Sequence, residues 1–410
     1  MGRFFLFGFI IGLIFWSISV SWVYDAINYY GAGKFLSFLM SILIISYLSI
    51  YFGIFACSIK YFEKNKYKII VLPSIFFILE WLRSWLFSGF PGQNLGVLFE
   101  ELWGLLPIIG VSGSSFVIVL IFCIIFSKSK AIVRFPAAFA LIFLLLFGPG
   151  HYQQNNGEKL KISVVQPLIN DIELLKEITT NAKSDIVVWP EAVGWYDQEI
   201  FVDLDNKTVI GGFFYESGEN ENTNIYTAIC NSKTRHCYEK KNLVPFGEFQ
   251  PLGNLLRPIS SFFNIPNSSL TSGTFNQKKS NWSGLVCWEI VFNSTFIDRV
   301  RGTEYIVHIS NDSWYGEEMP EMHLKHARAR AVESNKWVVR ATTDGISQII
   351  SPRKEESSAK LLRGEVGSVS HEIYLNNDDT LYIKIGDLPI LIFSFVNLIV
   401  GYLIRRKYES

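Results

Sequence analysis

Long stretches of chain without a single charge constrain what this protein can fold into. From Phe4 to Trp22 there are 19 uncharged residues, and a helix of that length spans about 28 Å, close to the hydrocarbon thickness of a bilayer. A secretory signal peptide is the competing interpretation, because the segment is N-terminal and follows Arg3, but no small-residue cleavage site comes after it. We therefore expect a retained membrane-spanning helix. Hydropathy predicts further spans at 36–58, 68–89, 113–127, 133–148 and 388–404.

The basic residues predict how these six spans are oriented, because Lys and Arg accumulate on the cytoplasmic side of a membrane. With Arg3 inside, six spans bring every basic cluster to the cytoplasm: Lys60, Lys64, Lys66 and Lys68; Lys128, Lys130 and Arg134; and Arg405, Arg406 and Lys407. We expect N-terminal transmembrane helices over 1–149, an extracytoplasmic domain over 150–386, and a C-terminal span with a basic cytoplasmic tail over 387–410.

The composition excludes several functional classes. Lys plus Arg and Asp plus Glu are equal at 37 each, so the chain has no overall positive field to hold a polyanion, and nucleic acid is not expected as a partner. The five cysteines are too few for a dense disulfide framework, and no CxxC or CxxH spacing indicates zinc. We expect no metal and no cofactor.

The region 150–386 has the pattern of a separate domain. Short apolar runs at 161–166, 185–190, 207–214, 283–288 and 304–310 alternate with polar segments, and continuous runs of this length are typical of strands buried on both faces. The segments 174–181 and 323–335 are predicted to be helices. An α/β layered domain is therefore the predicted class.

Three predicted strand ends carry a reactive side chain, and strand ends are where α/β proteins place their sites. Glu191 follows DIVVWP, Lys240 lies in YEKKNLVPFGEF, and Cys287 ends GLVC, where the chain turns from strand toward helix. Taken singly, each has an ordinary alternative: a surface-turn Glu, a solvated Lys and a core Cys. Together they indicate chemistry.

The three side chains fit attack by a thiol on a carbonyl group. A thiol with a free pKa of about 8.5 is only slightly ionised at neutral pH, so a base is needed, and Glu191 is the predicted base. Attack on an ester creates an oxyanion, which we expect Lys240 to stabilise together with a backbone N–H near Cys287.

Several long motifs resemble those of one known family. The string YEKKNLVPFGEFQP is similar to the Y-x-K-x-x-L-V-P-F-G-E signature of bacterial apolipoprotein N-acyltransferases, which are membrane-embedded members of the nitrilase superfamily. WPE at 189–191, VCWEIVF around Cys287, SNDSWYG at 310–316, RARAVESNKWVVRATTDGIS, and ILEWLRSWLFSGFPGQNLG at 78–96 also resemble its motifs. Trp288 stands where the family has a tyrosine.

The resemblance implies an α-helical membrane bundle plus a nitrilase-like α-β-β-α sandwich outside the cytoplasm. It implies a catalytic set of Glu191, Lys240 and Cys287. The supporting residues that it implies are Glu248 and Glu289, which orient the lysine and relay protons, and Trp288; the substrate-binding candidates are Phe246, Trp314, Tyr315, Glu80 and Arg83.

The reaction implied by the resemblance is a ping-pong acyl transfer. A phospholipid, with phosphatidylethanolamine as the expected donor, acylates Cys287 as a thioester. The N-terminal amine of a diacylglyceryl-cysteine apolipoprotein then takes the acyl group as an amide. The implied location is the bacterial inner membrane, with the catalytic domain in the periplasm and in contact with the lipid bilayer.

Two segments have more than one interpretation. Glu80 and Arg83 lie about one turn apart in an apolar span, where they form either a structural ion pair or part of a lipid-binding cleft. The segment 251–275 is apolar and broken by Pro and Gly, so it is either an arm that dips into the membrane surface or a packed loop.

The remaining cysteines and histidines are assigned from their surroundings. Cys230 and Cys237 bracket a polar turn, so a disulfide across a hairpin is as plausible as two free thiols. The histidines at 308, 323 and 326 are interpreted as packing or hydrogen-bonding residues. Two alternatives to the acyltransferase stay open: a membrane-anchored amidase or hydrolase that uses water as acceptor, and a non-catalytic scaffold of the same fold.

Overall fold

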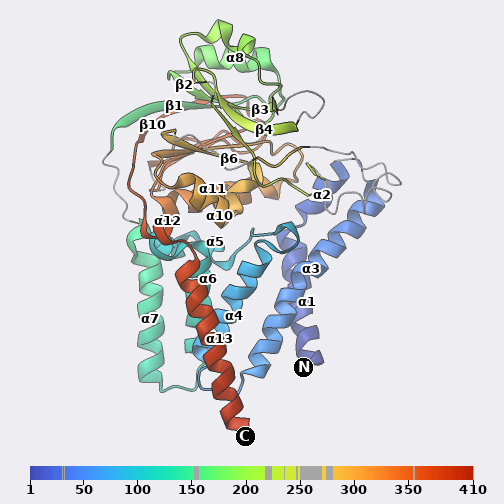
Figure 1. The fold of residues 1–410 in the computed structure, drawn as a ribbon, viewed down its shortest axis with the longest axis vertical. Helices are drawn as coiled ribbons and strands as arrows, with labels where there is room; N and C mark the ends of the chain where they lie inside the picture. The colour runs from blue at the N-terminus through green and yellow to red at the C-terminus, as the bar shows by residue number, and fades with distance from the viewer. Residues whose placement is uncertain are drawn as a thin grey trace. The chain divides into compact units, whose positions relative to one another are not determined.

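Two units of different composition make up the chain (Figure 1). The computed structural model describes residues 1–29, 31, 33–151, 157–217, 224–234, 236–245, 248–249, 270–273, 280–353 and 356–409. The helical unit comprises Met1–Tyr24, Lys34–Tyr152 and Thr380–Ser410, and the mixed unit comprises Asp25–Gly33 and Gln153–Asp379. Helix α2 (Trp22–Tyr29) contributes residues to both.

Apolar helices form almost all of the helical unit. They are α1 (Gly2–Ser19), α3 (Gly33–Tyr61), α4 (Lys68–Arg83), α5 (Leu95–Leu98), α6 (Leu106–Ile125), α7 (Ala131–Phe147), α12 (Leu381–Ile385) and α13 (Leu388–Glu409), with short 3-10 turns η1 (Leu86–Ser88), η2 (Glu100–Leu105) and η3 (Pro149–His151). Within the described residues, five stretches are long and apolar enough to cross a membrane: Gly2–Ser19, Gly33–Tyr61, Glu100–Ile125, Ala131–His151 and Leu388–Lys407.

Helix α6 lies at the centre of this unit. It packs against α4, α7 and the short α5, and α4 in turn packs against α13. In the most apolar window of Glu100–Ile125, 56% of residues are buried, against 17–22% in the other four spanning candidates. The outer helices therefore expose most of their apolar surface, which is what lipid-facing helices require.

The third predicted span, 68–89, is wrong in its extent. Helix α4 has 16 residues and is therefore about 24 Å long, short of the roughly 30 Å of hydrocarbon in a bilayer. Beyond Arg83 the backbone leaves the helix, with φ of 54°, 71° and 77° at Phe87, Ser88 and Gly89. The predicted orientation of the spans, which counted this segment as a full crossing, stays a prediction.

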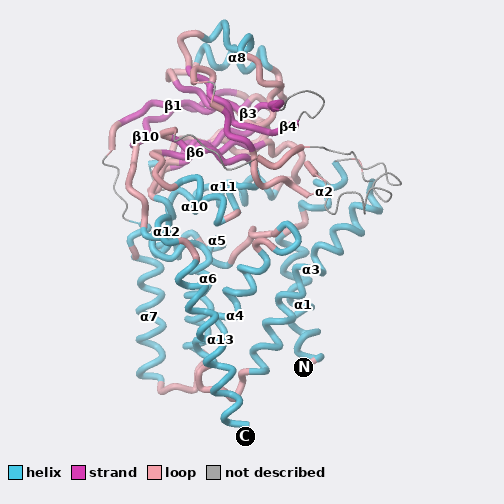
Figure 2. The backbone as a smooth tube through the Cα atoms, in the orientation of Figure 1, coloured by secondary structure: helices cyan, strands magenta, loops and turns pink. Residues whose placement is uncertain are grey.

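Two β-sheets form the middle of the mixed unit (Figure 2). The six-stranded sheet has the order β10-β1-β2-β3-β4-β5, with β10 (Gly367–Tyr374), β1 (Lys159–Gln166), β2 (Ile186–Val188), β3 (Thr208–Ser217), β4 (Asn224–Asn231) and β5 (Cys237–Glu239). The four-stranded sheet has the order β6-β7-β8-β9, with β6 (Trp282–Val286), β7 (Tyr305–Ser310), β8 (Val338–Thr342) and β9 (Gln348–Ile350).

The sheets pack face to face, and helices cover their outer faces. Helix α8 (Ile172–Asn181) and the 3-10 segment η4 (Gln198–Leu204) cover the first sheet, while α10 (Asn293–Val300) and α11 (Glu318–Ser334) cover the second (Figure 1). Between α8 and the first sheet, Leu175, Trp189 and Phe213 form an apolar core with their neighbours. This confirms the predicted α-β-β-α sandwich, since two-faced burial requires a layer on each side of each sheet.

A disulfide joins Cys230 and Cys237 in the first sheet. The two residues are direct partners in the antiparallel pair of β4 and β5, and their Cα atoms are 4.0 Å apart. The hairpin interpretation of the sequence is therefore confirmed, and the two-thiol alternative is not.

Candidate active site

Each of the three predicted reactive residues follows the end of a strand. Glu191 comes three residues after β2, Lys240 comes directly after β5, and Cys287 comes directly after β6, as the first residue of the 3-10 segment η6 (Cys287–Val291). Parallel pairing of β6 with β7 and of β2 with β3 brings the carboxyl ends of these strands to common edges. The sequence had predicted the change from strand to helix at Cys287, and the structure confirms it.

The backbone at Glu191 lies close against β3. The N–H of Gly212 donates to the carbonyl of Pro190 at 3.0 Å. A Cβ atom at position 212 would lie 2.7 Å from the Cα of Glu191, a separation that only glycine avoids. Glycine at position 212 therefore lets β3 lie this close to the backbone of Glu191, and this contact positions the Cα atom from which the Glu191 side chain extends.

Lys240 lies between two carboxylates. Its Nζ donates to Oε1 of Glu191 at 3.0 Å and to Oε1 of Glu248 at 2.6 Å. The second oxygens are also occupied: the N–H of Asn311 donates to Glu191 at 3.0 Å, and the N–H of Val244 donates to Glu248 at 2.8 Å. The lysine is fully buried, so this cluster is a fixed part of the interior, which contradicts the solvated-lysine alternative.

Burial and neighbouring charge determine the ionisation of this cluster. Burial lowers the pKa of Lys240, but the Glu191 and Glu248 carboxylates outweigh it and raise this pKa well above its usual value. Burial raises the pKa of Glu191 above that of an ordinary carboxyl, against the opposing charge of Lys240. Lys240 is therefore a permanent ammonium group, and Glu191 is a stronger base than an exposed glutamate.

Cys287 has a buried thiol on a strained backbone. Its residue exposure is 2%, its φ is 51°, in the left-handed region that non-glycine residues enter at a cost, and its Sγ lies 3.9 Å from the hydroxyl of Tyr315. Burial and then the charge of Glu191 raise the pKa of the thiol, while Lys240 lowers it. The thiol is therefore neutral at rest, and it lies close enough to both residues to respond to their charges.

Glu289 connects the turn at Cys287 to the segment that follows Lys240. Its Oε2 accepts from the Tyr238 hydroxyl and from the N–H of Val286, both at 2.9 Å. Its Oε1 accepts from the N–H groups of Lys241 and Asn242 at 2.6 and 3.1 Å. Three of these four donors are backbone N–H groups, so the buried carboxylate holds both backbone segments in place. The predicted role in positioning fits this geometry, and Glu248 contacts the lysine directly.

The other predicted site residues lie on nearby segments or outside the described part. Trp314 and Tyr315 stack with ring centroids 3.6 Å apart, and the Trp288 ring packs 6.2 Å from that of His323. Phe246 and the segments 251–269 and 274–275 of the predicted arm lie outside the described residues.

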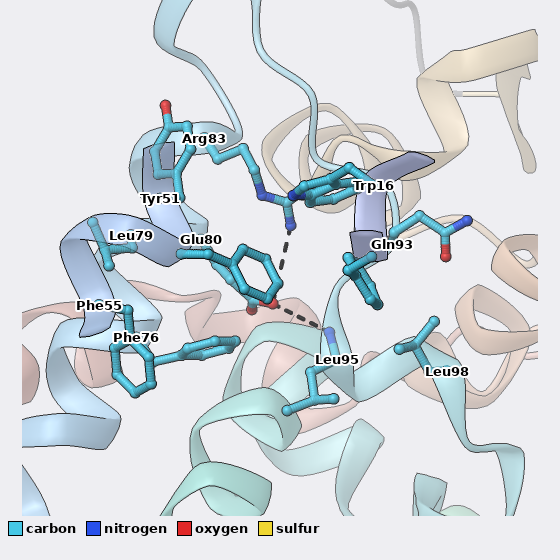
Figure 3. A pocket seen from close by; sticks show the side chains of 12 residues that line it. Trp16, Tyr51, Phe55, Phe76, Leu79, Glu80, Arg83, Gln93, Leu95 and Leu98 are labelled. Atoms are coloured by element: carbon cyan, nitrogen blue, oxygen red, sulfur yellow. Dashed lines mark hydrogen bonds and ion pairs between the residues drawn. The ribbon is translucent and has the colours of Figure 1, made fainter. Parts of the chain in front are cut away.

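The helical unit contains an aromatic cavity of about 260 Å³ that Glu80 and Arg83 line (Figure 3). Nη2 of Arg83 lies 4.0 Å from Oε1 of Glu80. Arg83 also donates to the carbonyl groups of Phe90 and Gly92 at 2.8 and 2.7 Å, and Glu80 accepts from the N–H of Leu95 at 3.1 Å. The structural ion pair is therefore present and ties the segment after α4 to the helix. The pair also borders a cavity, and its part in a lipid-binding cleft stays a prediction.

Some residues that shape the site were not singled out from the sequence. Asn311 anchors Glu191 through its backbone, and Arg363 donates to the carbonyl groups of Ser313, Tyr315 and Gly316. Arg363 lies in a charged stretch that is typical of a surface loop, so no local pattern marks it. Among the described residues, no group of three or more His, Cys, Asp or Glu side chains has the arrangement of a metal site.

Two family models match separate parts of the chain. The family model of the apolipoprotein N-acyltransferase N-terminal domain matches residues 1–124, and the carbon-nitrogen hydrolase model matches residues 205–359. Among solved structures, a CN-hydrolase superfamily protein from Xanthomonas campestris is 14% identical, with a TM-score of 0.37 and coverage of 53% of this chain and 91% of that one.

Relatives similar over nearly the whole chain carry one common name. The apolipoprotein N-acyltransferase of Wigglesworthia glossinidia brevipalpis is 31% identical, over 98% of this chain and 89% of that protein. That of Pasteurella multocida is 27% identical, over 97% of this chain and 87% of that protein. With the nitrilase-like sandwich, the apolar helices and this similarity together, the chain belongs to the apolipoprotein N-acyltransferase family.

Proposed function

We propose that this protein moves a fatty acyl chain from a phospholipid, through a thioester on Cys287, to the N-terminal amine of a diacylglyceryl-cysteine apolipoprotein. The observation that carries the proposal is the buried thiol beside the Lys240 ammonium and the Glu191 carboxylate. A family of acyltransferases and a chain rich in apolar helices supply the context, since phospholipid acyl chains lie within the membrane.

The first half-reaction acylates the thiol. Glu191 takes the proton from Sγ of Cys287 as the sulfur attacks the carbonyl carbon of the donor ester. Because burial raises the pKa of the thiol, little thiolate exists beforehand, and proton removal must accompany attack. The tetrahedral intermediate then collapses to a thioester, and the leaving lysophospholipid oxygen takes the proton back from Glu191.

The Lys240 ammonium stabilises the negative oxygen of that intermediate. It has three N–H bonds, and Glu191 and Glu248 accept two of them. The third can be donated to the oxyanion in a site from which water is excluded, where a fixed charge is most effective. In the second half-reaction the amine attacks the thioester and Glu191 takes a proton from the nitrogen. The C–S bond then breaks, and Glu191 returns that proton to the sulfur, which leaves as the thiol.

The proposed setting is the bacterial inner membrane, with the mixed unit in the periplasm. The Cys230–Cys237 disulfide supports this side of the membrane, because such bonds persist in oxidising compartments. Phosphatidylethanolamine is the proposed donor. Trp314 and Tyr315 are the proposed aromatic contacts of the substrate, and the cavity beside Glu80 and Arg83 is a proposed site for an acyl chain within the helical unit.

The test follows a labelled acyl chain through both half-reactions. The full-length protein in detergent is incubated with phosphatidylethanolamine that carries isotopically labelled acyl chains. We expect the labelled acyl mass on the peptide that contains Cys287, removable by hydroxylamine. A diacylglyceryl-cysteine peptide with a free amine should then discharge the thioester and gain the label, whereas the N-acetylated peptide should not.

Two results would contradict the proposal. Discharge at equal rates with and without the free amine would make water the acceptor and would favour the hydrolase. Failure of every phospholipid tested to acylate the folded protein would exclude a phospholipid donor.

Replacing Glu191 by Gln is expected to slow thiol acylation by about 10²- to 10⁴-fold, the usual contribution of a general base. In the wild type, acylation should fall as pH decreases through the pKa of Glu191, because the protonated carboxyl cannot accept the thiol proton. Since this pKa is raised above 4.5, the fall in rate on the acid side of the pH profile, its acidic limb, should occur at a higher pH than an ordinary carboxyl would give.

The measurement is the pH profile of single-turnover acylation, with Glu173→Gln as the matched control, because Glu173 is an exposed glutamate on α8. The control should reproduce the wild-type profile, whereas the Glu191 variant should lose the acidic limb. An unchanged limb in Glu191→Gln would assign the base to another group.

A further inference from the structure

Two buried histidines share one acceptor, the backbone carbonyl oxygen of Cys287. Nε2 of His308 and Nε2 of His323 each lie 3.1 Å from it. His308 is on β7 and His323 is on α11, and both side chains are fully buried. A carbonyl oxygen only accepts hydrogen bonds, so a ring nitrogen that bonds to it must carry a proton.

Arg340 fixes which nitrogen of His308 carries that proton. Its Nη1 lies 2.9 Å from Nδ1 of His308 and 3.4 Å from Nε2. A guanidinium group only donates and Nε2 already faces the Cys287 carbonyl, so Nδ1, at the shorter distance, is the unprotonated acceptor. Burial, followed by the charge of Arg340, lowers the pKa of His308 well below its usual value. His308 is therefore neutral, with its one proton on Nε2 and directed at Cys287.

Two further acceptors hold the arginine in place. Its Nη2 donates to Oδ2 of Asp312 at 2.6 Å, and its Nε donates to the carbonyl of Ile346 at 3.1 Å. Strand register places Arg340 directly opposite His308. The tautomer of His308 is thus determined by a buried ion pair that has no role in the chemistry described above.

His323 stands between two acceptors. Its Nδ1 is 3.1 Å from Oδ1 of Asp312, which also accepts from the hydroxyl of Ser310 at 2.5 Å. Burial and the charge of Arg340 lower the pKa of His323, and a neutral ring has one proton for the two oxygens. His308 therefore donates to the Cys287 carbonyl in every state, and His323 donates only when Nε2 is protonated.

Because the peptide group is planar, the hydrogen bonds to the Cys287 carbonyl oxygen also affect the N–H of Trp288. The carbonyl of Cys287 and the N–H of Trp288 belong to one planar trans peptide, so they point in opposite directions. Fixing the oxygen fixes the N–H, and donation to the oxygen also polarises the group and strengthens the N–H as a donor. The φ of 51° at Cys287 makes this peptide one that needs such support.

We propose that His308, with its tautomer set by Arg340, is a positioning residue that aligns the Cys287–Trp288 peptide so that the Trp288 N–H donates to the oxyanion alongside Lys240. The inference rests on the proposed acyl transfer. Removing one oxyanion donor typically costs about 10²- to 10³-fold in rate, and a misaligned donor should cost about 10- to 100-fold.

The test compares two substitutions of one residue. His308→Leu removes the donor, whereas His308→Gln keeps an N–H near the position of Nε2. In the full-length protein we expect His308→Leu to lower kcat of acylation about 10- to 100-fold with little change in KM, and His308→Gln to recover most of the loss. Alkylation of Cys287 by iodoacetamide, which forms no oxyanion, should stay within about 3-fold of wild type in both variants, because the inference places His308 in oxyanion binding only.

A histidine on β10 provides the matched control. His371 also bonds to a backbone carbonyl, with Nε2 2.9 Å from the oxygen of Glu356. His371→Leu and His371→Gln should both acylate like the wild type. The inference is wrong if His308→Leu acylates normally, if Gln rescues no better than Leu, or if alkylation falls in parallel with acylation. A wild type that forms no acyl-enzyme would instead overturn the proposed function.

Discussion

Replacing Cys287 by Ala should abolish the acyl-enzyme and lower transfer by about 10⁴-fold or more, the loss seen when the nucleophile of a catalytic set is removed. The thiol is the buried nucleophilic atom beside both Glu191 and Lys240. Without it, the donor ester meets only the base and the cation, neither of which forms a covalent intermediate. The measurement is N-acylation of a labelled acceptor peptide, together with the mass of the peptide that contains residue 287.

Cys287→Ser separates loss of chemistry from loss of fold. A hydroxyl fills nearly the same space but ionises far less readily than a thiol, so we expect folding to be retained and acylation to fall by about 10³-fold or more. Both variants should unfold at nearly the wild-type temperature. Transfer that continues in Cys287→Ala, with label appearing on the acceptor, would contradict a thioester mechanism.

Replacing Lys240 by Met should damage both activity and stability. Activity should fall by about 10³-fold, because the oxyanion loses its cation. Glu191 and Glu248 would keep their negative charges in the interior without Nζ, and breaking a buried ion pair in this way typically costs about 3–5 kcal/mol. The free energy of unfolding, measured by denaturant titration, should show the largest deficit at high pH. The Glu191 carboxyl, whose pKa burial raises, is then ionised, and the deficit shrinks as it protonates.

Two further variants test this explanation. Lys240→Met combined with Glu191→Gln removes one stranded charge, so it should regain part of the stability and none of the activity. Lys176 also contacts two carboxylates, at 3.2 and 3.6 Å, but its partners Glu173 and Asp203 are exposed. Lys176→Met should therefore cost less than about 1 kcal/mol. Equal destabilisation by the two single substitutions would contradict the buried-cluster argument.

The membrane-spanning helices were predictable because their signal is local. An uncharged window of sufficient length predicts a span whatever it packs against, and five windows became long helices. Helix α4 departed from this rule. Its end at Arg83 depends on the carbonyl groups of Phe90 and Gly92 that the side chain reaches, and hydropathy carries no information about those contacts.

In the candidate site, too, local features were predictable from the sequence and long-range contacts were not. Glu191, Lys240 and Cys287 were marked by strand ends and motifs, and the structure brings the three side chains within electrostatic range of one another. The bonds of His308 and Arg340 were not predicted, although hydrogen bonding by the histidine was expected. Their pairing depends on the register of β7 with β8, which no local pattern encodes.

The Cys230–Cys237 disulfide also bears on how the proposed nucleophile, Cys287, stays reduced. The two cysteines are seven residues apart and directly opposite in register, so an oxidant closes a short loop between them at little entropic cost. Thiol–disulfide exchange requires a thiolate and access, and Cys287 is 2% exposed with a raised pKa. Once the domain has folded, Cys287 is kinetically protected from mispairing. In the oxidising compartment proposed above, we therefore expect oxidative folding to leave the third thiol of this unit reduced.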